Sequence, residues 1–171
     1  MAIGPVQLLV VAFDEPHFTG GIVEELNRLR ANDLIRLLDV LVVTKDLDGS
    51  VTAAQVSDLS IGEAEEIGAL IGALIGVGFD GEDGMEAGAL IGAEAGADGH
   101  LIPDSEMYDV ADSIPPGSAA ALALIEHVWA GPLRDAIASA GGTPVSDSWV
   151  HPLDLVEVGL MAADELEAIQ N

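Results

Sequence analysis

Four histidines are the side chains in this sequence best suited to bind a metal or move a proton: His17, His100, His127 and His151. No two of them have the four-residue spacing that places two zinc ligands on one face of a helix. The sequence has no Cys, which excludes thiol enzymes and cysteine-ligated metal centres. Glu126 and His127 are adjacent, so on a strand they point to opposite faces. A metal or small-ligand site assembled from distant segments stays open as an alternative.

Residues 76–81 fit the pattern GxGxxG of dinucleotide-binding loops. That chemistry needs a preceding strand and a following helix, so that backbone N–H groups face the pyrophosphate. Here a helical segment comes first, and the acids Asp80, Glu82 and Asp83 would repel phosphate. We therefore expect no nucleotide cofactor.

Residues 46–49 (Asp-Leu-Asp-Gly) resemble the start of a calcium-binding loop. The twelfth position of such a loop is a Glu, but here it is Ser57. Because Asp-Gly lies between two apolar runs, the segment predicts a hairpin turn rather than a metal site.

A cluster of hydrolase-type side chains lies near the end of the sequence: Ser146, Asp147, Ser148 and His151. They fall on an expected strand and its exit, and the sequence contains no GxSxG motif. The sequence therefore indicates no catalytic residue, no cofactor and no metal site.

The charge of the chain excludes further classes of function. The 171 residues include 30 Asp and Glu but 5 Lys and Arg, a net charge of −25, while half of the residues are hydrophobic. A chain this apolar is able to fold, and one this acidic is unsuited to bind nucleic acid. The N-terminus has no signal-peptide pattern, so we expect a cytoplasmic protein.

The elements that must position these residues follow from apolar patterning. Strands are expected at residues 5–13, 35–44, 50–56, 118–127 and 143–150. Helices are expected at residues 19–31, from 61 through the glycine-rich region, 104–114, 131–140 and 152–169. Thr19 and Asp104 are candidate N-caps, and Ser60 with Glu63 predicts a capping box. The helical side chains expected to face a core are Ile22, Leu26, Leu29, Met107, Val110, Ala111, Ile114, Leu133, Ile137 and Ala140.

The glycine-rich region contains a small internal repeat. GALIGA occurs at residues 68–73 and again at 88–93. Glycines recur every four residues in two series, first at Gly68, Gly72 and Gly76 and then at Gly84, Gly88, Gly92 and Gly96. This spacing places them on one helical face, where each costs roughly 1 kcal/mol relative to Ala. We therefore expect a helical hairpin that presses its glycine faces together, or against a neighbouring chain. The apolar side chains opposite the glycines also need cover: Ile67, Leu70, Ile71, Leu74 and Ile75.

The order of elements predicts an α+β fold of one domain over residues 1–171. Its plan is a ferredoxin-like split βαβ core with an inserted edge strand, a glycine-rich helical hairpin and a C-terminal helix. The three parts are a first βαβ half with the hairpin strand (1–56), the glycine-zipper insertion (57–100) and the second half (101–171). Because the strands are apolar on both faces, we expect the hairpin or a partner subunit to cover the second face. The residues expected at a sheet-face interface are Leu9, Val11, Phe13, Leu37, Leu41 and Val43.

Several segments resemble an uncharacterised family of acidic actinobacterial proteins. They are GPVQLLVVAF, IRLLDVLVVTKDLDG, the paired glycine-rich segments, IPPGSAAALALIEHVWAGPLRDAI and SWVHP. The chain is similar more distantly to stress-associated proteins described as "predicted membrane". The resemblance implies a ferredoxin-like core with a glycine-zipper hairpin and a stress-related role, and it supplies no catalytic residue.

The sequence predicts a non-enzymatic protein whose partner is a second copy of itself, as a homodimer or a larger homo-oligomer. The first alternative is a ligand- or metal-binding module with a pocket between sheet and hairpin. The second is peripheral membrane association through residues 67–79. That segment has 13 residues where a span needs about 20, and acids flank it, which disfavours a membrane role.

Overall fold

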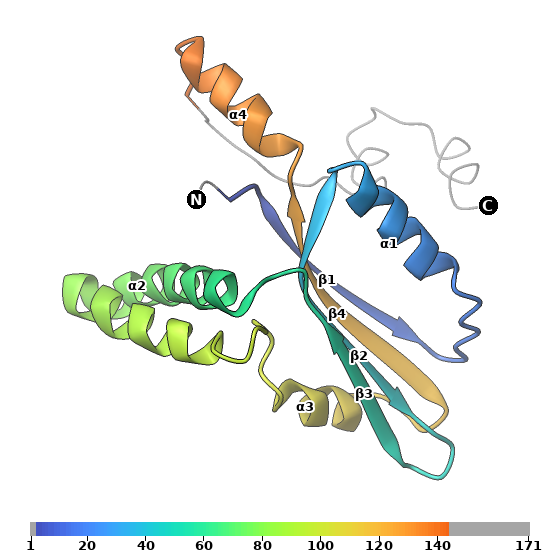
Figure 1. Cartoon of the computed structure of the whole chain (residues 1–171). Helices are drawn as coiled ribbons and strands as arrows, with labels where there is room; N and C mark the ends of the chain where they lie inside the picture. The colour runs from blue at the N-terminus through green and yellow to red at the C-terminus, as the bar shows by residue number, and fades with distance from the viewer. Residues whose placement is uncertain (1–2, 144–171) are drawn as a thin grey trace, which may run out of the picture. The chain divides into compact units, whose positions relative to one another are not determined.

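The computed structural model describes residues 3–143, without the side chains of residues 74, 75 and 78–80. The chain divides into two compact units, Met1–Asp135 and Ala136–Asn171. The described residues form a mixed α+β structure with one four-stranded antiparallel sheet (Figure 1). The strand predicted at 143–150 and the helix predicted at 152–169 fall almost wholly outside the described residues.

The sheet contains β1 (Val6–Phe13), β2 (Ile35–Lys45), β3 (Val51–Val56) and β4 (Ser118–His127), in the order β1-β4-β2-β3. Every neighbouring pair is antiparallel. These bounds confirm the four strands predicted in this region, including β3 as an edge strand. The Asp48-Gly49 turn between β2 and β3 is also confirmed, and Gly49 has a positive φ of 86° that suits glycine.

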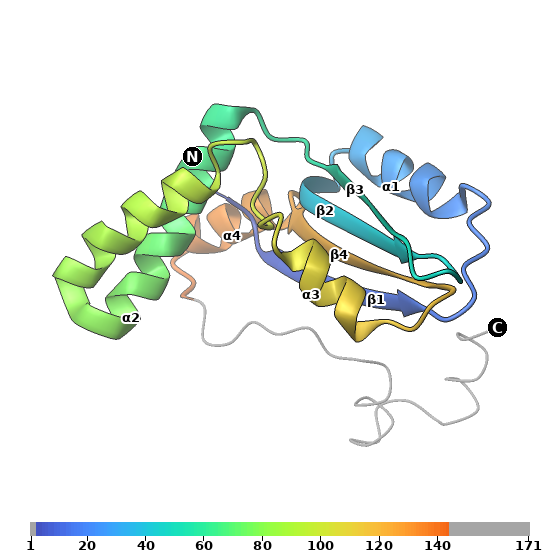
Figure 2. The ribbon, with the colours of Figure 1, turned by 90° about the horizontal axis from the view of Figure 1, so that it is seen from below.

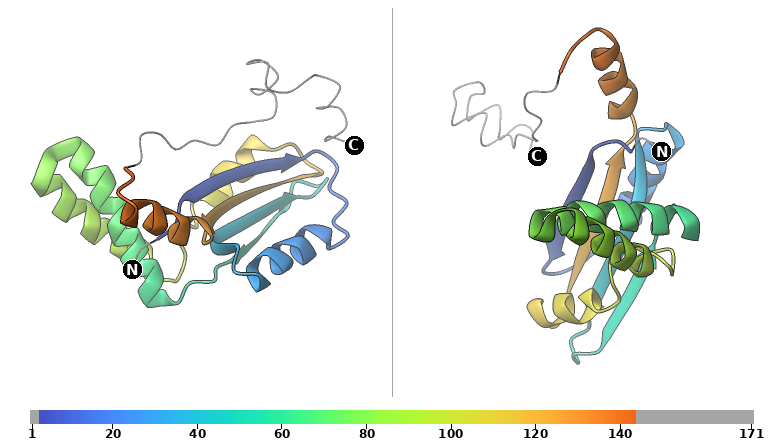
Figure 3. Two further views of the ribbon diagram at one scale, coloured as in Figure 1. Left: turned by 90° about the horizontal axis from the view of Figure 1, so that it is seen from above. Right: turned by 90° about the vertical axis from the view of Figure 1, so that its left-hand side faces the viewer.

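Helices lie on both faces of the sheet (Figures 2 and 3). On one face, Leu26 and Leu29 of α1 (Gly21–Ala31) pack against a cluster formed by β2 and β4, which includes Leu37. On the other face, Val110 and Ala111 of α3 (Glu106–Ser113) pack against a second cluster: Leu41, Val43, Ile102, Ile114 and Ala120. The second face was predicted to be covered by the glycine-rich hairpin or by a partner subunit, but around β2 and β4 the helix α3 covers it instead.

The strand β2 serves both clusters because it contains a β-bulge. Its register against β4 shifts between Leu37 and Asp39, leaving Leu38 as the extra residue. Before the bulge, Leu37 faces α1, and after it Leu41 and Val43 face α3. A bulge reverses the alternation of faces along a strand, so one strand supplies both cores.

The helix ends confirm one predicted cap and correct two. Ser60 and Glu63 form the predicted capping box. Thr19 was predicted as an N-cap, but the chain enters α1 through Gly20 at a φ of 92°, one residue later. Asp104 was also predicted as an N-cap, but Ser105 takes that position, and it is already helical and makes no side-chain cap bond.

Four side chains predicted to face a core are instead exposed: Ile22, Leu133, Ile137 and Ala140. Ile22 is exposed because α1 contributes only Leu26 and Leu29 to the cluster and has no fully buried residue. Leu133 and Ile137 are exposed on α4 (Ala130–Ser139), of which no residue is buried among the described parts of the chain. Amphipathic spacing identifies a helix but not how much of its apolar face is covered.

The helix α2 (Ile61–Ala95) reverses direction along its length, and its two halves lie side by side (Figures 1 and 2). Gly81, between the halves, has a φ of 60°. A Cβ atom added at Gly72 would collide with the backbone carbonyl of Gly88 across the gap. The same holds for the pairs Gly68 with Gly92 and Gly76 with Gly84. The backbones approach so closely that only glycine fits at these positions.

Candidate functional site

The most enclosed polar group in the described residues is the carboxylate of Asp39, whose exposed fraction is 0%. Its Oδ2 accepts hydrogen bonds from Gln55 Nε2 at 2.8 Å, from the Leu101 backbone N–H at 2.7 Å and from that of Ile102 at 2.8 Å. Its Oδ1 lies 3.1 Å from His100 Nδ1. A buried carboxylate held by several donors is stable only while every bond is made.

A histidine oriented by a carboxylate is the arrangement that general bases use. Catalysis would also need a nucleophile or a substrate hydroxyl within hydrogen-bond reach of the ring. Among the described side-chain contacts, the His100 ring has only the bond to Asp39. The hydrogen bonds of this cluster hold residues 100–102, which follow α2, against the middle of the sheet.

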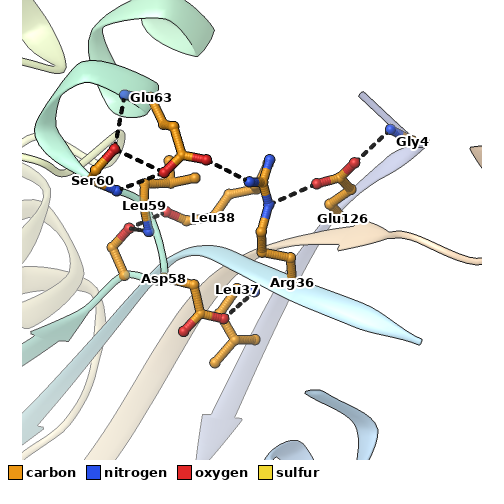
Figure 4. Close-up of polar contacts among 10 residues, drawn as sticks. Gly4, Arg36, Leu37, Leu38, Asp58, Leu59, Ser60, Glu63 and Glu126 are labelled. Carbon is orange, nitrogen blue, oxygen red and sulfur yellow. Dashed lines mark hydrogen bonds and ion pairs between the residues drawn. The ribbon is translucent and has the colours of Figure 1, made fainter. Parts of the chain in front are cut away.

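A second polar network surrounds Arg36 near the start of β2 (Figure 4). Its Nε lies 2.9 Å from Glu126 Oε2 and its Nη1 lies 3.0 Å from Glu63 Oε1. Glu126 also accepts the Gly4 backbone N–H at 2.6 Å. One guanidinium thus joins β2, β4, the start of α2 and the segment before β1.

Glu63 makes two kinds of contact in this network. It accepts the Ser60 backbone N–H at 3.0 Å, and it is paired with Arg36. The bond from the Ser60 backbone, followed by that from the Ser60 hydroxyl and by the charge of Arg36, lowers the pKa of Glu63 below its ordinary value. The ionised carboxylate therefore stabilises the first turn of α2.

The bulge in β2 has its own partners. Ser57 Oγ donates to the Leu38 carbonyl at 2.7 Å, and the Leu37 backbone N–H donates to Asp58 Oδ2 at 3.0 Å. Asp58 also forms an ion pair with Arg30 of α1. Beside this ion pair lies an open hollow of about 650 Å³, also lined by Asn27, Asp33 and Arg36. The charged groups lining it are largely engaged with one another, as expected of a structural clamp.

The remaining described histidines lie apart from this cluster. His17 Nδ1 lies 2.8 Å from the Glu15 carbonyl, and His127 Nε2 lies 3.1 Å from Gln7 Oε1. Within residues 3–143, no group of three or more His, Asp or Glu is arranged to hold a metal ion. None of the helices in that range has the length and apolar character to cross a membrane. His151 and the Ser146–Ser148 cluster lie outside the described residues.

The glycines predicted for helix packing face one another within this chain. Gly96 completes the series, since a Cβ there would meet the backbone of Ala64. Ile67 is buried, while Leu70 and Ile71 are exposed. The side chains of Leu74 and Ile75 are not among those described.

The residues predicted at one sheet-face interface are divided between two faces. Leu37, Leu41 and Val43 are buried inside this chain, and the bulge places Leu37 on the face opposite to the other two. They are therefore unavailable to a partner in this form of the chain, which corrects the predicted interface. Leu9, Val11 and Phe13 belong to β1, on the α1 side of the sheet.

The largest apolar surface that the described sheet leaves open is β1 itself. It pairs only with β4, so its other edge has no partner strand among the described residues. Leu8 and Val10, on the α3 side, have exposed fractions of 60% and 63%. The sequence predicted the two apolar faces of β1, but it did not predict that α1 and α3 leave both uncovered.

Comparison with known proteins finds no matching family model, no similar curated protein and no similar solved structure. The functional conclusion therefore depends on this chain's own geometry, and the resemblance to the acidic actinobacterial family stays a prediction.

Proposed function

We propose that this protein is non-enzymatic and assembles with copies of itself. One observation carries the proposal: β1 exposes large apolar side chains on both faces of the sheet, at an edge with no partner among the described strands. Burying apolar surface gains about 25 cal/mol per Å². A second copy of the chain offers the same surface and so provides a matching partner.

The outer side of the α2 hairpin is a second surface for a larger assembly. Leu70, Ile71, Leu90 and Ile91 are exposed there. Because the glycines of the two halves already face each other, contact between hairpins would use these leucines and isoleucines. Leu70 and Ile71 belong to the residues expected from the sequence to need cover, whereas Leu90 and Ile91 do not.

Light scattering and sedimentation over a salt series test the proposed assembly. Copies with a charge of −25 repel one another, and salt screens that repulsion. We expect the average mass to rise as salt increases from about 0.01 M to about 1 M. A mass that stays at 17.5 kDa over the whole series would reject self-association.

The hollow beside Arg30 and Asp58, rather than the expected pocket between sheet and hairpin, favours a second candidate function, the binding of a small polar ligand. Its volume of about 650 Å³ lies in the range of ligand pockets. Native mass spectrometry of the purified chain would detect a bound molecule. A ligand-free chain whose melting temperature does not respond to a panel of small polar compounds would reject this candidate.

We also propose the ferredoxin-like plan as the finer description of the fold. The described order, β-α-β-β-α-α-β-α, contains two interleaved units. The strands β1 and β2 run parallel with β4 between them, and β3 and β4 run parallel with β2 between them. The interleaved split units support this plan, whereas the positions of α1 and α3 on opposite faces of the sheet depart from it, and an experimental structure of the whole chain would test it.

A further inference from the structure

We infer that two copies of this chain pair through β1, edge to edge and antiparallel, about a two-fold axis near Leu9. This inference rests on the proposed self-association and specifies its interface. The sheet would then continue from one copy into the other and contain eight strands in the order β3-β2-β4-β1, followed by the same strands in reverse.

Within the described residues, the edge of β1 lacks the features that normally prevent strand addition. Natural edge strands are protected by charges, prolines, bulges or short length. Val6–Phe13 contains no charged residue and no Pro, and its register against β4 is unbroken over all eight residues. It is therefore a regular edge on which another strand can pair.

The position of the acids selects the antiparallel arrangement. Asp14 and Glu15 follow β1 directly, whereas Gly4 and Pro5 precede it. Parallel pairing would place the acids of both copies side by side, at a cost in repulsion. Antiparallel pairing about Leu9 places Asp14 of each copy beside the uncharged Gly4 of the other.

The same arrangement covers the exposed side chains. In an antiparallel pair, residues directly opposite each other point to the same face of the sheet. A two-fold axis between two identical strands lies where one residue is opposite the same residue of the other copy. With Leu9 at the axis, Leu8 of each copy lies opposite Val10 of the other, on the α3 side. The two most exposed large apolar side chains of β1, Leu8 and Val10, therefore cover each other at two places in the pair.

The other edge of the sheet is less suited to this role. β3 has six residues rather than eight, and acids flank both of its ends. Pairing of two β3 strands in antiparallel fashion would bring Asp58 of each copy near Asp48 of the other. Like charges at that position oppose association in a chain that is already strongly acidic.

Single-cysteine variants of the full chain test the arrangement, because the natural sequence has no Cys. Leu9 and Val6 are matched, with exposed fractions of 40% and 41% on the same strand. In the proposed pair, two Leu9 Cα atoms lie about 5 Å apart, within disulfide range. Two Val6 Cα atoms lie six residues out of register, about 20 Å apart.

We expect Leu9→Cys to form a covalent dimer under mild oxidation at least about tenfold faster than Val6→Cys. Circular dichroism and urea unfolding of both variants under reducing conditions would establish that they fold. Equal cross-linking of both variants would overturn the antiparallel arrangement. No cross-linking of Leu9→Cys, in a chain that light scattering shows to be dimeric, would overturn the β1 interface and leave self-association standing. A natural chain that stays monomeric would overturn both.

Discussion

At the scale of single residues, Asp39 shows where local sequence reasoning ends. An acid in the middle of the apolar run of β2 is visible in the sequence. Its partners are separated from it by 16 residues for Gln55 and by about four times that for His100, Leu101 and Ile102. No periodicity connects these positions, so the cluster becomes visible only in the folded chain.

Substitution of Asp39 tests its structural role. Asp39→Ala removes the acceptor for two backbone N–H groups and for Gln55, and unpaired buried donors cost about 1–3 kcal/mol each. We expect a loss of about 3 kcal/mol in the free energy of unfolding, measured by urea titration. Asp39→Asn keeps one oxygen and should lose less. Asp48→Ala, in the exposed turn, is the control. Equal losses for Asp39→Ala and Asp48→Ala would contradict the role.

The lowered pKa of Glu63 leads to a prediction about how stability depends on pH. Its pKa is lowered in the folded chain, so the stability it adds is fully present above its unfolded pKa. That stability is lost as the pH falls through the lower, folded pKa. The stability difference between the natural chain and Glu63→Gln should therefore shrink from pH 6 to about pH 3. A difference that stays constant over this range would show that the charge of Glu63 is not what stabilises α2.

At the scale of elements, sequence patterns predict what is local. The four strands, the Asp48-Gly49 turn and the Ser60–Glu63 capping box depend on residues close together in the chain, and all are confirmed. The bulge at Leu38 was not predicted, because it depends on Ser57 and Asp58 supplying bonds to it. For the same reason, Leu37, Leu41 and Val43 were predicted on one face, whereas Leu37 lies on the α1 side and the other two lie on the α3 side.

The close approach within α2 gives a sharp contrast between two glycines. A Cβ at Gly72 would collide with backbone atoms of Gly88, whereas a Cβ at Gly62 meets nothing. We expect Gly72→Ala to destabilise the chain by about 1–3 kcal/mol, since backbone cannot yield as a side chain does. Gly62→Ala should be neutral or stabilising by up to roughly 1 kcal/mol, because Ala favours the helix. Thermal unfolding of both variants measures the contrast, and equal effects would contradict the close packing of the two halves.

At the scale of the whole molecule, association between copies depends on the balance between apolar attraction and charge repulsion. A net charge of −25 keeps copies apart in general, so association must use a surface without carboxylates. Composition alone indicates this balance. It does not indicate where the surface lies, because that depends on which strand the helices leave uncovered.

Two lysine substitutions locate the surface. Val10 on β1 and Val56 on β3 are both well exposed, at 63% and 54%, and they lie on opposite edges of the sheet. Val10→Lys places a charge in the proposed interface and should raise the dimer dissociation constant at least about tenfold. Val56→Lys changes the net charge equally and should leave it unchanged. Sedimentation equilibrium measures both, and weaker association of Val56→Lys alone would point to the other edge.

Because β2 contains an extra residue, both cores depend on the same alternation of side chains along this strand. Deleting Leu38 would turn every side chain on one flank of the deletion to the opposite side of the sheet, so that either the α1 side or the α3 side would receive the wrong residues. Mutational scans should therefore tolerate volume-conserving apolar exchanges along this strand better than any shortening of it.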